Sequence, residues 1–251
     1  MISGASIHKK LFKRCMEKDK KEDKSIVNYE DIVTTGFSKD LTDVGIDFTE
    51  IGIDSFLDNE IIKDIPVVKT IFSLVKTGLA IRERCFAKNF LTFLNQYHCG
   101  KLDQKEKDEF FKKYNDDSSY REKIVSLLVK INDRYFESDQ SQIAGNLFVA
   151  YVKNLISWED YVILCRCLDG YMPFVSSYLD ELESKKRPYH EPNLQPGVHT
   201  AAILQACGMG YIWGRNFYAT TFGILIHQYG IKADYSRTVK QLIEYAGYKT
   251  E

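Results

Sequence analysis

The most hydrophobic stretch of the chain runs from residue 64 to residue 98, and its apolar side chains recur at steps of three and four. This spacing predicts helix with one apolar face. Pro66 fits the first turn of such a helix, where its missing N–H group costs nothing. Lys69, Lys76 and Glu83 lie a heptad apart and form a polar stripe. The apolar positions are Ile65, Val68, Phe72, Val75, Leu79, Phe86, Phe90 and Phe93.

Further helices are predicted on both sides of this stretch. Residues 39–58 carry apolar side chains at helical spacing, with acidic residues on the other side. Asp103 and Glu106 predict a capping box that opens a helix to about Tyr114. Each later start signal agrees with the periodic pattern behind it, which supports the assignment. The later helices cover residues 124–135, Ser138 to about Tyr151, and Ser157 to about Leu168, the last with Tyr161, Leu164, Cys165 and Leu168 pointing inward.

The C-terminal part of the chain differs in character. Two aromatic runs, Tyr211–Trp213 and Phe217–Ala219, flank the triplet Gly214-Arg215-Asn216. Short aromatic runs around a glycine-containing triplet predict a β-hairpin with a short turn. The other elements predicted here are a helix at about 198–207, a helix capped by Thr220 or Thr221 and stopped by Gly230, and a helix at about 236–246.

The prolines mark a boundary. Four of the five fall between residues 173 and 196, and residues 184–197 combine them with charged side chains, which is typical of a linker. We therefore predict a mainly α fold, a multi-helix bundle followed by a small unit with one β-hairpin. The predicted division is a polar N-terminal segment (1–38), a helical bundle domain (39–183), a linker (184–197) and a C-terminal unit (198–251).

Charge and cysteine content narrow the functional classes. The chain has 34 Lys+Arg residues against 35 Asp+Glu residues, so no overall electrostatic attraction to nucleic acid is expected. Its six cysteines are scattered, and the charged N-terminus is not followed by an apolar segment. Both features indicate reduced, mostly buried thiols and a cytoplasmic location.

Motifs for catalysis and metal binding are missing from the sequence. Cys165 and Cys167 lie two residues apart in a predicted helix, so they point about 200° apart and do not share an ion. The five histidines lack H-E-x-x-H spacing, and residues 208–214 have the glycine spacing of turns, not of a nucleotide loop. The sequence predicts no metal and no cofactor and favours a non-enzyme, although a site built from distant residues leaves no motif.

The first resemblance covers roughly residues 40–180. The run Lys63–Val68, continuing into Lys76–Arg84, resembles a motif in a family of uncharacterised bacterial helical proteins of this size. Such proteins tend to be found in mobile or defence-related gene neighbourhoods. The resemblance implies a helical middle region and a bacterial context, and it implies no activity.

The second resemblance lies near the C-terminus. Ala202–Gly230 is similar to the back half of a winged helix: helix, glycine-rich corner, hairpin wing, then a second helix. The C-terminal unit is therefore expected to be winged-helix-like. A winged helix that reads DNA has a positive recognition helix, whereas Val198–Cys207 contains no Lys or Arg. The resemblance thus implies the fold more strongly than DNA binding.

Three functions remain open from the sequence. The first is a non-catalytic protein-interaction or regulatory protein of bacterial type that binds a protein partner. The second is a winged-helix DNA-binding regulator that uses Arg215 at the wing tip. The candidate interaction residues for both are Trp213, Arg215, Phe217 and Tyr218.

The third function is a membrane-active effector, in a phage-defence context, that uses the amphipathic helix at 64–94. A lysine at the centre of a spanning helix costs about 3 kcal/mol, so this helix would lie on a membrane surface. The alternative is that the same stretch is the central buried helix of the bundle. The candidate membrane or partner residues are Val68, Lys69, Phe72, Val75, Lys76 and Leu79.

Overall fold

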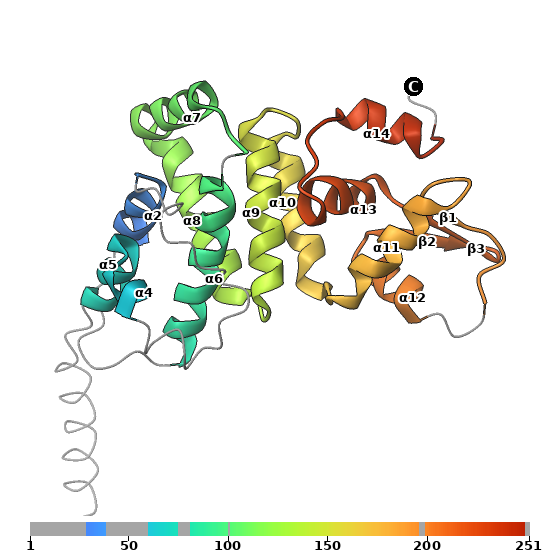
Figure 1. Cartoon of the computed structure of the whole chain (residues 1–251), viewed down its shortest axis with the longest axis horizontal. Coiled ribbons are helices and arrows are strands. Elements are labelled where there is room, and N and C mark those ends of the chain that lie inside the picture. The colour runs from blue at the N-terminus through green and yellow to red at the C-terminus, as the bar shows by residue number, and fades with distance from the viewer. Residues whose placement is uncertain (1–28, 39–59, 75–80, 100, 196–198, 249–251) are drawn as a thin grey trace, which may run out of the picture.

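The computed structural model describes residues 29–38, 60–74, 81–99, 101–195 and 199–248. These residues form a mainly helical chain with a small antiparallel sheet near its C-terminal end (Figure 1). The predicted fold class, a multi-helix bundle followed by a small unit with a β-hairpin, is confirmed. The bundle consists of α2 (Tyr29–Ser38), α4 (Glu60–Asp64), α5 (Pro66–Leu74), α6 (Ile81–His98), α7 (Gln104–Asp116), α8 (Ser118–Arg134), α9 (Ser138–Val152), α10 (Trp158–Cys167) and the 3-10 turn η2 (Leu168–Gly170).

Helix α11 and strand β1 precede the predicted C-terminal unit (198–251) but contact its elements, so residues 174–248 are described together as the C-terminal unit. Its elements follow in the order helix, strand, helix, hairpin and helices. In the described residues its strands form one antiparallel sheet in the order β1-β3-β2. The elements are α11 (Phe174–Ser184), β1 (His190–Glu191), α12 (His199–Ala206), β2 (Gly210–Trp213), β3 (Asn216–Ala219), α13 (Thr221–Leu225), the π-helix η3 (Ile226–Ile231) and α14 (Val239–Tyr245).

Local capping signals set several helix starts, as predicted. The Glu106 N–H donates to the Asp103 carboxylate at 2.8 Å, and the Asp103 N–H donates back to Glu106 at 2.9 Å. Ser157 makes the same reciprocal cap at the start of α10. These bonds satisfy N–H groups that have no partner within the helix. The helix predicted at 39–58 lies outside the described residues.

The hydrophobic stretch at 64–98 forms two helices, α5 and α6, on either side of residues 75–80, which lie outside the described residues. Helix α5 begins at Pro66, as predicted. Val68 is fully buried, whereas Lys69 is exposed and its ammonium lies 3.0 Å from the Asp64 carboxylate. Helix α5 therefore turns an apolar face inward against α2.

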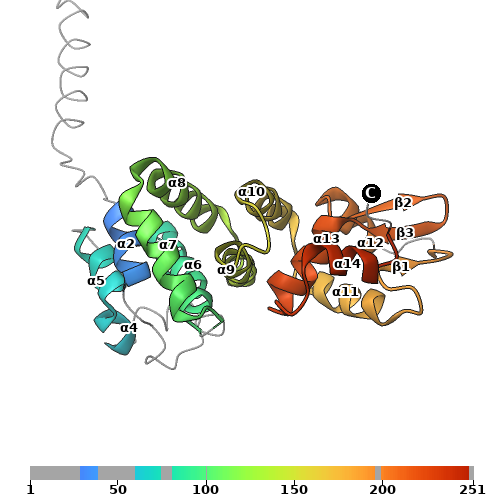
Figure 2. The same ribbon diagram turned by 90° about the horizontal axis from the view of Figure 1, so that it is seen from above.

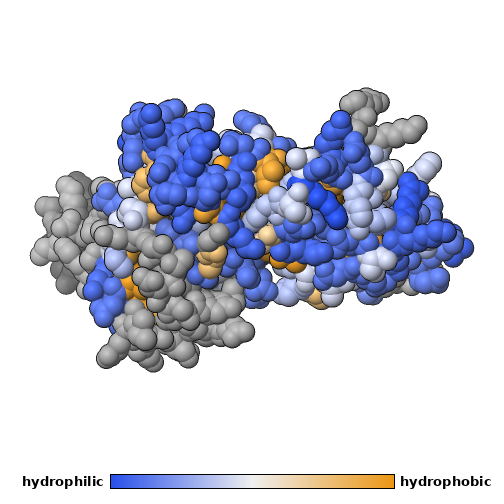
Figure 3. Space-filling model, turned by 45° about the horizontal axis from the view of Figure 1, so that its top comes forward, coloured by the Kyte–Doolittle hydropathy of each residue, from blue (hydrophilic) through white to orange (hydrophobic). Residues whose placement is uncertain are grey.

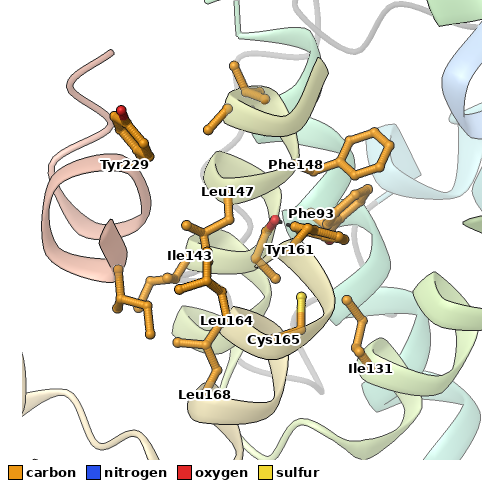
Figure 4. Packing of buried hydrophobic residues seen from close by; sticks show 14 of the residues in the cluster. Phe93, Ile131, Ile143, Leu147, Phe148, Tyr161, Leu164, Cys165, Leu168 and Tyr229 are labelled. Carbon is orange, nitrogen blue, oxygen red and sulfur yellow. Dashed lines mark hydrogen bonds between the residues drawn. The ribbon is translucent and has the colours of Figure 1, made fainter. Parts of the chain in front are cut away.

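Helix α9 is the centre of the core. Eleven of its 15 residues are buried, which is typical of a helix surrounded by other elements. It packs between α6 on one side and η3 on the other (Figures 1 and 2). Figure 4 shows Phe148 turned toward Phe93 of α6, while Ile143 and Leu147 face the side of η3 that carries Tyr229.

Two glycines permit the close approach of helices to α9. A Cβ atom on Gly145 would lie 2.8 Å from the main-chain oxygen of Phe93, so α6 and α9 pack backbone to backbone. A Cβ atom on Gly230 would lie 2.6 Å from a methyl carbon of Ile143. The Asn146 amide also donates to the Gly230 carbonyl at 2.8 Å. These contacts join the bundle to the C-terminal unit through one continuous core.

The segment predicted as a linker, 184–197, is partly built into the sheet. Its residues His190 and Glu191 pair with β3, and Tyr189 is fully buried. The Tyr189 N–H donates to the Leu182 carbonyl at 2.8 Å, which ties this segment to α11. The composition of the segment did not predict the strand. The division into domains at this segment stays a prediction.

Figure 3 shows one face of the molecule, on which hydrophilic residues cover most of both parts. Hydrophobic residues reach this face in patches, among them the area near the middle where the bundle meets the C-terminal unit. This distribution matches a single core that continues across the junction.

Candidate functional site

The predicted hairpin forms the outer part of the C-terminal unit. Strands β2 and β3 are joined by the two-residue turn Gly214-Arg215, and Trp213 pairs with Asn216 across it. Gly214 has a φ of 63°, a left-handed conformation that glycine adopts without strain. A glycine at this position therefore stabilises a tight turn and holds Arg215 at the tip.

An aromatic row crosses one face of the sheet. The register aligns Tyr211, Tyr218 and His190 side by side on strands β2, β3 and β1. The rings of Tyr211 and Tyr218 stack with centroids 5.1 Å apart, and the His190 ring lies 4.6 Å from Tyr218. Trp213 extends this face, because alternate residues of a strand point to the same side. We call Trp213, Tyr211, Tyr218 and His190 the aromatic face.

Strand β2 is an edge strand. Figure 2 shows it at the outer border of the sheet, and within the described part of the chain no strand pairs with its outer side. The pair that closes a two-residue turn is hydrogen-bonded, and such pairs alternate along an antiparallel ladder. The main-chain N–H and C=O groups of Ile212 therefore point outward. Trp213 is 73% exposed and Tyr211 is 42% exposed.

The structure divides the predicted interaction residues between two faces. Trp213 and Arg215 are exposed, and Tyr218 is half-buried within the aromatic face. Phe217 is fully buried on the opposite face of the sheet, where its ring lies 6.0 Å from that of Tyr178. Phe217 therefore stabilises the hairpin through the buried face of the sheet and is not part of the exposed surface.

Among the residues predicted for a membrane or partner helix, the structure describes the side chains of Val68 and Lys69. Val68 is buried and Lys69 lies on the outer side of α5. The side chain of Phe72 lies outside the described residues, as do Val75, Lys76 and Leu79. None of the helices in the described ranges has the length and apolar character needed to cross a lipid bilayer.

A second cluster lies between α11 and η3. Asp180 and Glu183 are three residues apart on α11 and share one face of that helix. His227 reaches them from η3, and its Nε2 lies 2.9 Å from the Asp180 carboxylate. The nearest ligand-type atoms of these three residues all lie within 4.8 Å of one another. These residue types in this arrangement are able to hold a divalent metal ion. We call them the Asp-Glu-His cluster.

Hydrogen bonds hold the cluster from the buried side. The Tyr189 hydroxyl lies 2.8 Å from Nδ1 of His227, and the Gln228 amide donates to that hydroxyl at 2.6 Å. The same amide donates to Glu183 at 2.7 Å, and the Lys232 ammonium lies 2.6 Å from the other Glu183 oxygen. A carboxylate only accepts, so the His227 ring donates its Nε2–H to Asp180. In the neutral ring Nδ1 is then the acceptor, and the Tyr189 hydroxyl donates to it.

Burial determines the protonation state of this network. Desolvation lowers the pKa of His227 below its ordinary value, against the opposing effect of the Asp180 hydrogen bond. Burial raises the pKa of the Tyr189 hydroxyl. His227 is therefore neutral and Tyr189 protonated at neutral pH.

The buried cysteines show no sign of nucleophilic chemistry. Burial raises the pKa of Cys165 to about 12 and that of Cys167 to about 11, so both remain thiols at neutral pH. Cys167 and Cys207 line a surface groove of about 510 Å³ together with mostly apolar side chains, and Arg166 and Asp169 also border it. Burial raises the pKa of Cys207 as well, so neither sulfur in the groove is an activated thiolate at neutral pH.

Comparison with protein-family models, curated proteins and solved structures found no match.

The residues predicted from the sequence include Trp213 and Tyr218 of the aromatic face, but not Tyr211, His190 or the Asp-Glu-His cluster. The hairpin signal is local, so Trp213, Arg215 and Tyr218 were identified from their own neighbourhood. His227 lies more than 40 positions beyond Asp180 and Glu183. Only the D-x-x-E spacing on one predicted helix face was available as a signal, and this spacing is common on solvated helices.

Proposed function

We propose that this chain is a non-catalytic interaction protein that binds a protein partner through its C-terminal hairpin. The observation that carries the proposal is Trp213, which is 73% exposed on an unpaired edge strand next to the stacked aromatic face. Tryptophan, tyrosine and arginine dominate binding hot spots, and Tyr211 and Arg215 lie beside Trp213. Burial of a tryptophan of this exposure contributes on the order of 4 kcal/mol.

The edge of β2 suggests how the partner binds. An exposed edge strand with large apolar side chains invites pairing with another chain, and soluble proteins usually cover or charge such edges. An extended partner segment that adds as a further strand would pair with the outward main-chain groups of Ile212. Its side chains would then lie against Trp213 and Tyr211 on the aromatic face.

A DNA-binding role is the second candidate. The order α12, glycine corner, hairpin and α13 supports the winged-helix interpretation of this unit. The exposed residues of α12 are His199, Ala202, Gln205 and Ala206, so this helix brings no Lys or Arg to a phosphate backbone. Arg215 at the turn is a single basic residue, which favours a protein partner over a duplex.

Selection of random extended peptides on the immobilised full chain tests the proposal. In a Trp158→Phe background, fluorescence comes from Trp213, and binding is expected to shift its emission to shorter wavelength. Trp213→Ser removes this fluorophore, so its binding is measured by peptide capture on the immobilised chain; it should be weaker by roughly tenfold or more, because the main buried contact is lost. Ile212→Pro should weaken it similarly, because it removes the outward N–H at a position where an edge strand tolerates proline.

Phe136→Ser is the matched control, since Phe136 is an exposed aromatic residue in the bundle, in the connection between α8 and α9 and far from the hairpin (Figure 1). It should leave binding unchanged. Peptide binding that survives both Trp213→Ser and Ile212→Pro would contradict the proposal. Sub-micromolar duplex DNA binding with a steep salt dependence, lost in Arg215→Ala, would favour the second candidate.

A further inference from the structure

We propose that the Asp-Glu-His cluster is a zinc site that clips α11 to η3. The inference is independent of the partner-binding function and rests on the ligand types and their geometry. Zinc binds histidine nitrogen and carboxylate oxygen at about 2.0–2.2 Å, so its ligand atoms lie about 3–4 Å apart. The nearest atoms of Asp180, Glu183 and His227 all lie within 4.8 Å of one another, which small side-chain rotations bring into that range.

Helix geometry places the three ligands without large rearrangement. Asp180 and Glu183 share a face of α11, and η3 packs against that face. The element that carries His227 is a π-helix, a rare form that is frequent at functional sites. His227 is fully buried, whereas the Asp180 side chain is 59% exposed. The ion would therefore have a solvated side, and water would complete its coordination.

The imidazole ligand selects the class of ion. Magnesium and calcium prefer oxygen ligands alone, whereas imidazole suits zinc and its transition-metal neighbours. Tyr189 supports the ring as an outer hydrogen-bond partner at Nδ1, the arrangement that orients metal-binding histidines. In the bound form Nε2 carries the ion, so the single proton of the neutral ring is on Nδ1 and donates to the Tyr189 oxygen, and the Tyr189 O–H rotates away from the ring.

Lys232 competes with the ion for Glu183. Its ammonium lies 2.6 Å from the Glu183 carboxylate. In the ion-free form this ammonium neutralises the carboxylate charge, which zinc would neutralise when bound. The Lys232 side chain is partly exposed and is able to swing into solvent when the ion enters. A purely structural hydrogen-bond network would only be weakened by loss of Lys232, whereas a zinc site would gain affinity.

Zinc chloride titration of the full-length, chelator-treated chain tests this inference. Calorimetry should show one ion bound per chain, and Co²⁺ should give the visible absorption of a low-symmetry site. Asp180→Asn should weaken zinc binding by at least roughly tenfold, since loss of a direct ligand exceeds the usual effect of losing an outer-shell partner. Because the Asp180 side chain is exposed, this variant is the ligand substitution that best preserves folding. Its melting temperature in the presence of chelator checks that the fold is intact.

Two further variants sharpen the test. Glu181→Gln, an exposed carboxylate beside the cluster on α11, should bind zinc as the wild type does. Lys232→Ala should bind more tightly than the wild type. The inference is overturned by the absence of saturable zinc binding, by equal losses in Asp180→Asn and Glu181→Gln, or by unchanged or weaker binding in Lys232→Ala. Peptide binding is measured in the presence of chelator, so that failure of the proposed partner-binding function is detected independently of zinc binding.

Discussion

Replacement of Phe148 by alanine is expected to lower the free energy of unfolding by about 3–5 kcal/mol. Phe148 is fully buried on α9 and its ring meets those of Phe37, Phe93, Phe110 and Tyr161. These partners belong to four different helices, each held in place by its other contacts, so they do not move together to fill the cavity left by the ring. Urea unfolding followed by circular dichroism measures the change.

Phe136→Ala is the control for this prediction. Phe136 is 91% exposed, so its removal should change the free energy of unfolding by no more than about 0.5 kcal/mol. The loss in Phe148→Ala is a large fraction of a typical total of about 5–15 kcal/mol, so the variant should also melt much earlier. Equal stability of the two variants would show that α9 is not the centre of the core.

Replacement of Gly223 by alanine is expected to cost about 3 kcal/mol, at the upper end of the range for overpacking. A Cβ atom at this position would overlap the main-chain carbonyl oxygen of Met209. That carbonyl accepts the Thr220 N–H at 2.9 Å, where α13 meets the start of the hairpin. The backbone cannot move aside without loss of this bond, so α13 would detach from the hairpin. Hydrogen exchange of β2 and β3 amides should accelerate together with the loss of stability.

Gly170→Ala provides a contrast of the same chemical size. Its added methyl group would meet the Cys207 sulfur at 2.6 Å, and that side chain is free to rotate away. Its cost should therefore be clearly smaller than that of Gly223→Ala. If Gly170→Ala proved the more destabilising of the two, the close packing of α13 against Met209 would be contradicted.

Much of the helical architecture follows from short-range signals. The caps at Asp103 and Ser157 and the start of α5 at Pro66 depend on residues within one turn of each other. Helical periodicity predicts that Tyr161 and Cys165 point inward, and both are fully buried in the structure. The hairpin was likewise predictable, because the glycine and its flanking aromatic runs lie within nine residues. Such features form wherever the local chain favours them.

Long-range pairing accounts for what the pattern did not predict. Strand β1 is two residues long and has no periodicity of its own, so it exists because β3 supplies its hydrogen-bond partners. Alternation along β3 places Phe217 and Tyr218 on opposite faces of the sheet, but it does not predict which face the helices cover. In the structure the helices cover the face that carries Phe217, which is fully buried, and leave Trp213 exposed on the other face.

The Asp-Glu-His cluster depends entirely on packing. In the sequence, Asp180 and Glu183 have the pattern of solvated charges on a helix. In the structure, η3 packs against α11 and places His227 beside them. That contact requires α9 to accept Gly230 at close range, which no local spacing specifies. Sequence patterns thus set the elements and their apolar faces, because these depend on neighbouring residues. The meeting of side chains more than 40 positions apart was set by the shape of the core, since only the packed chain brings them within bonding distance.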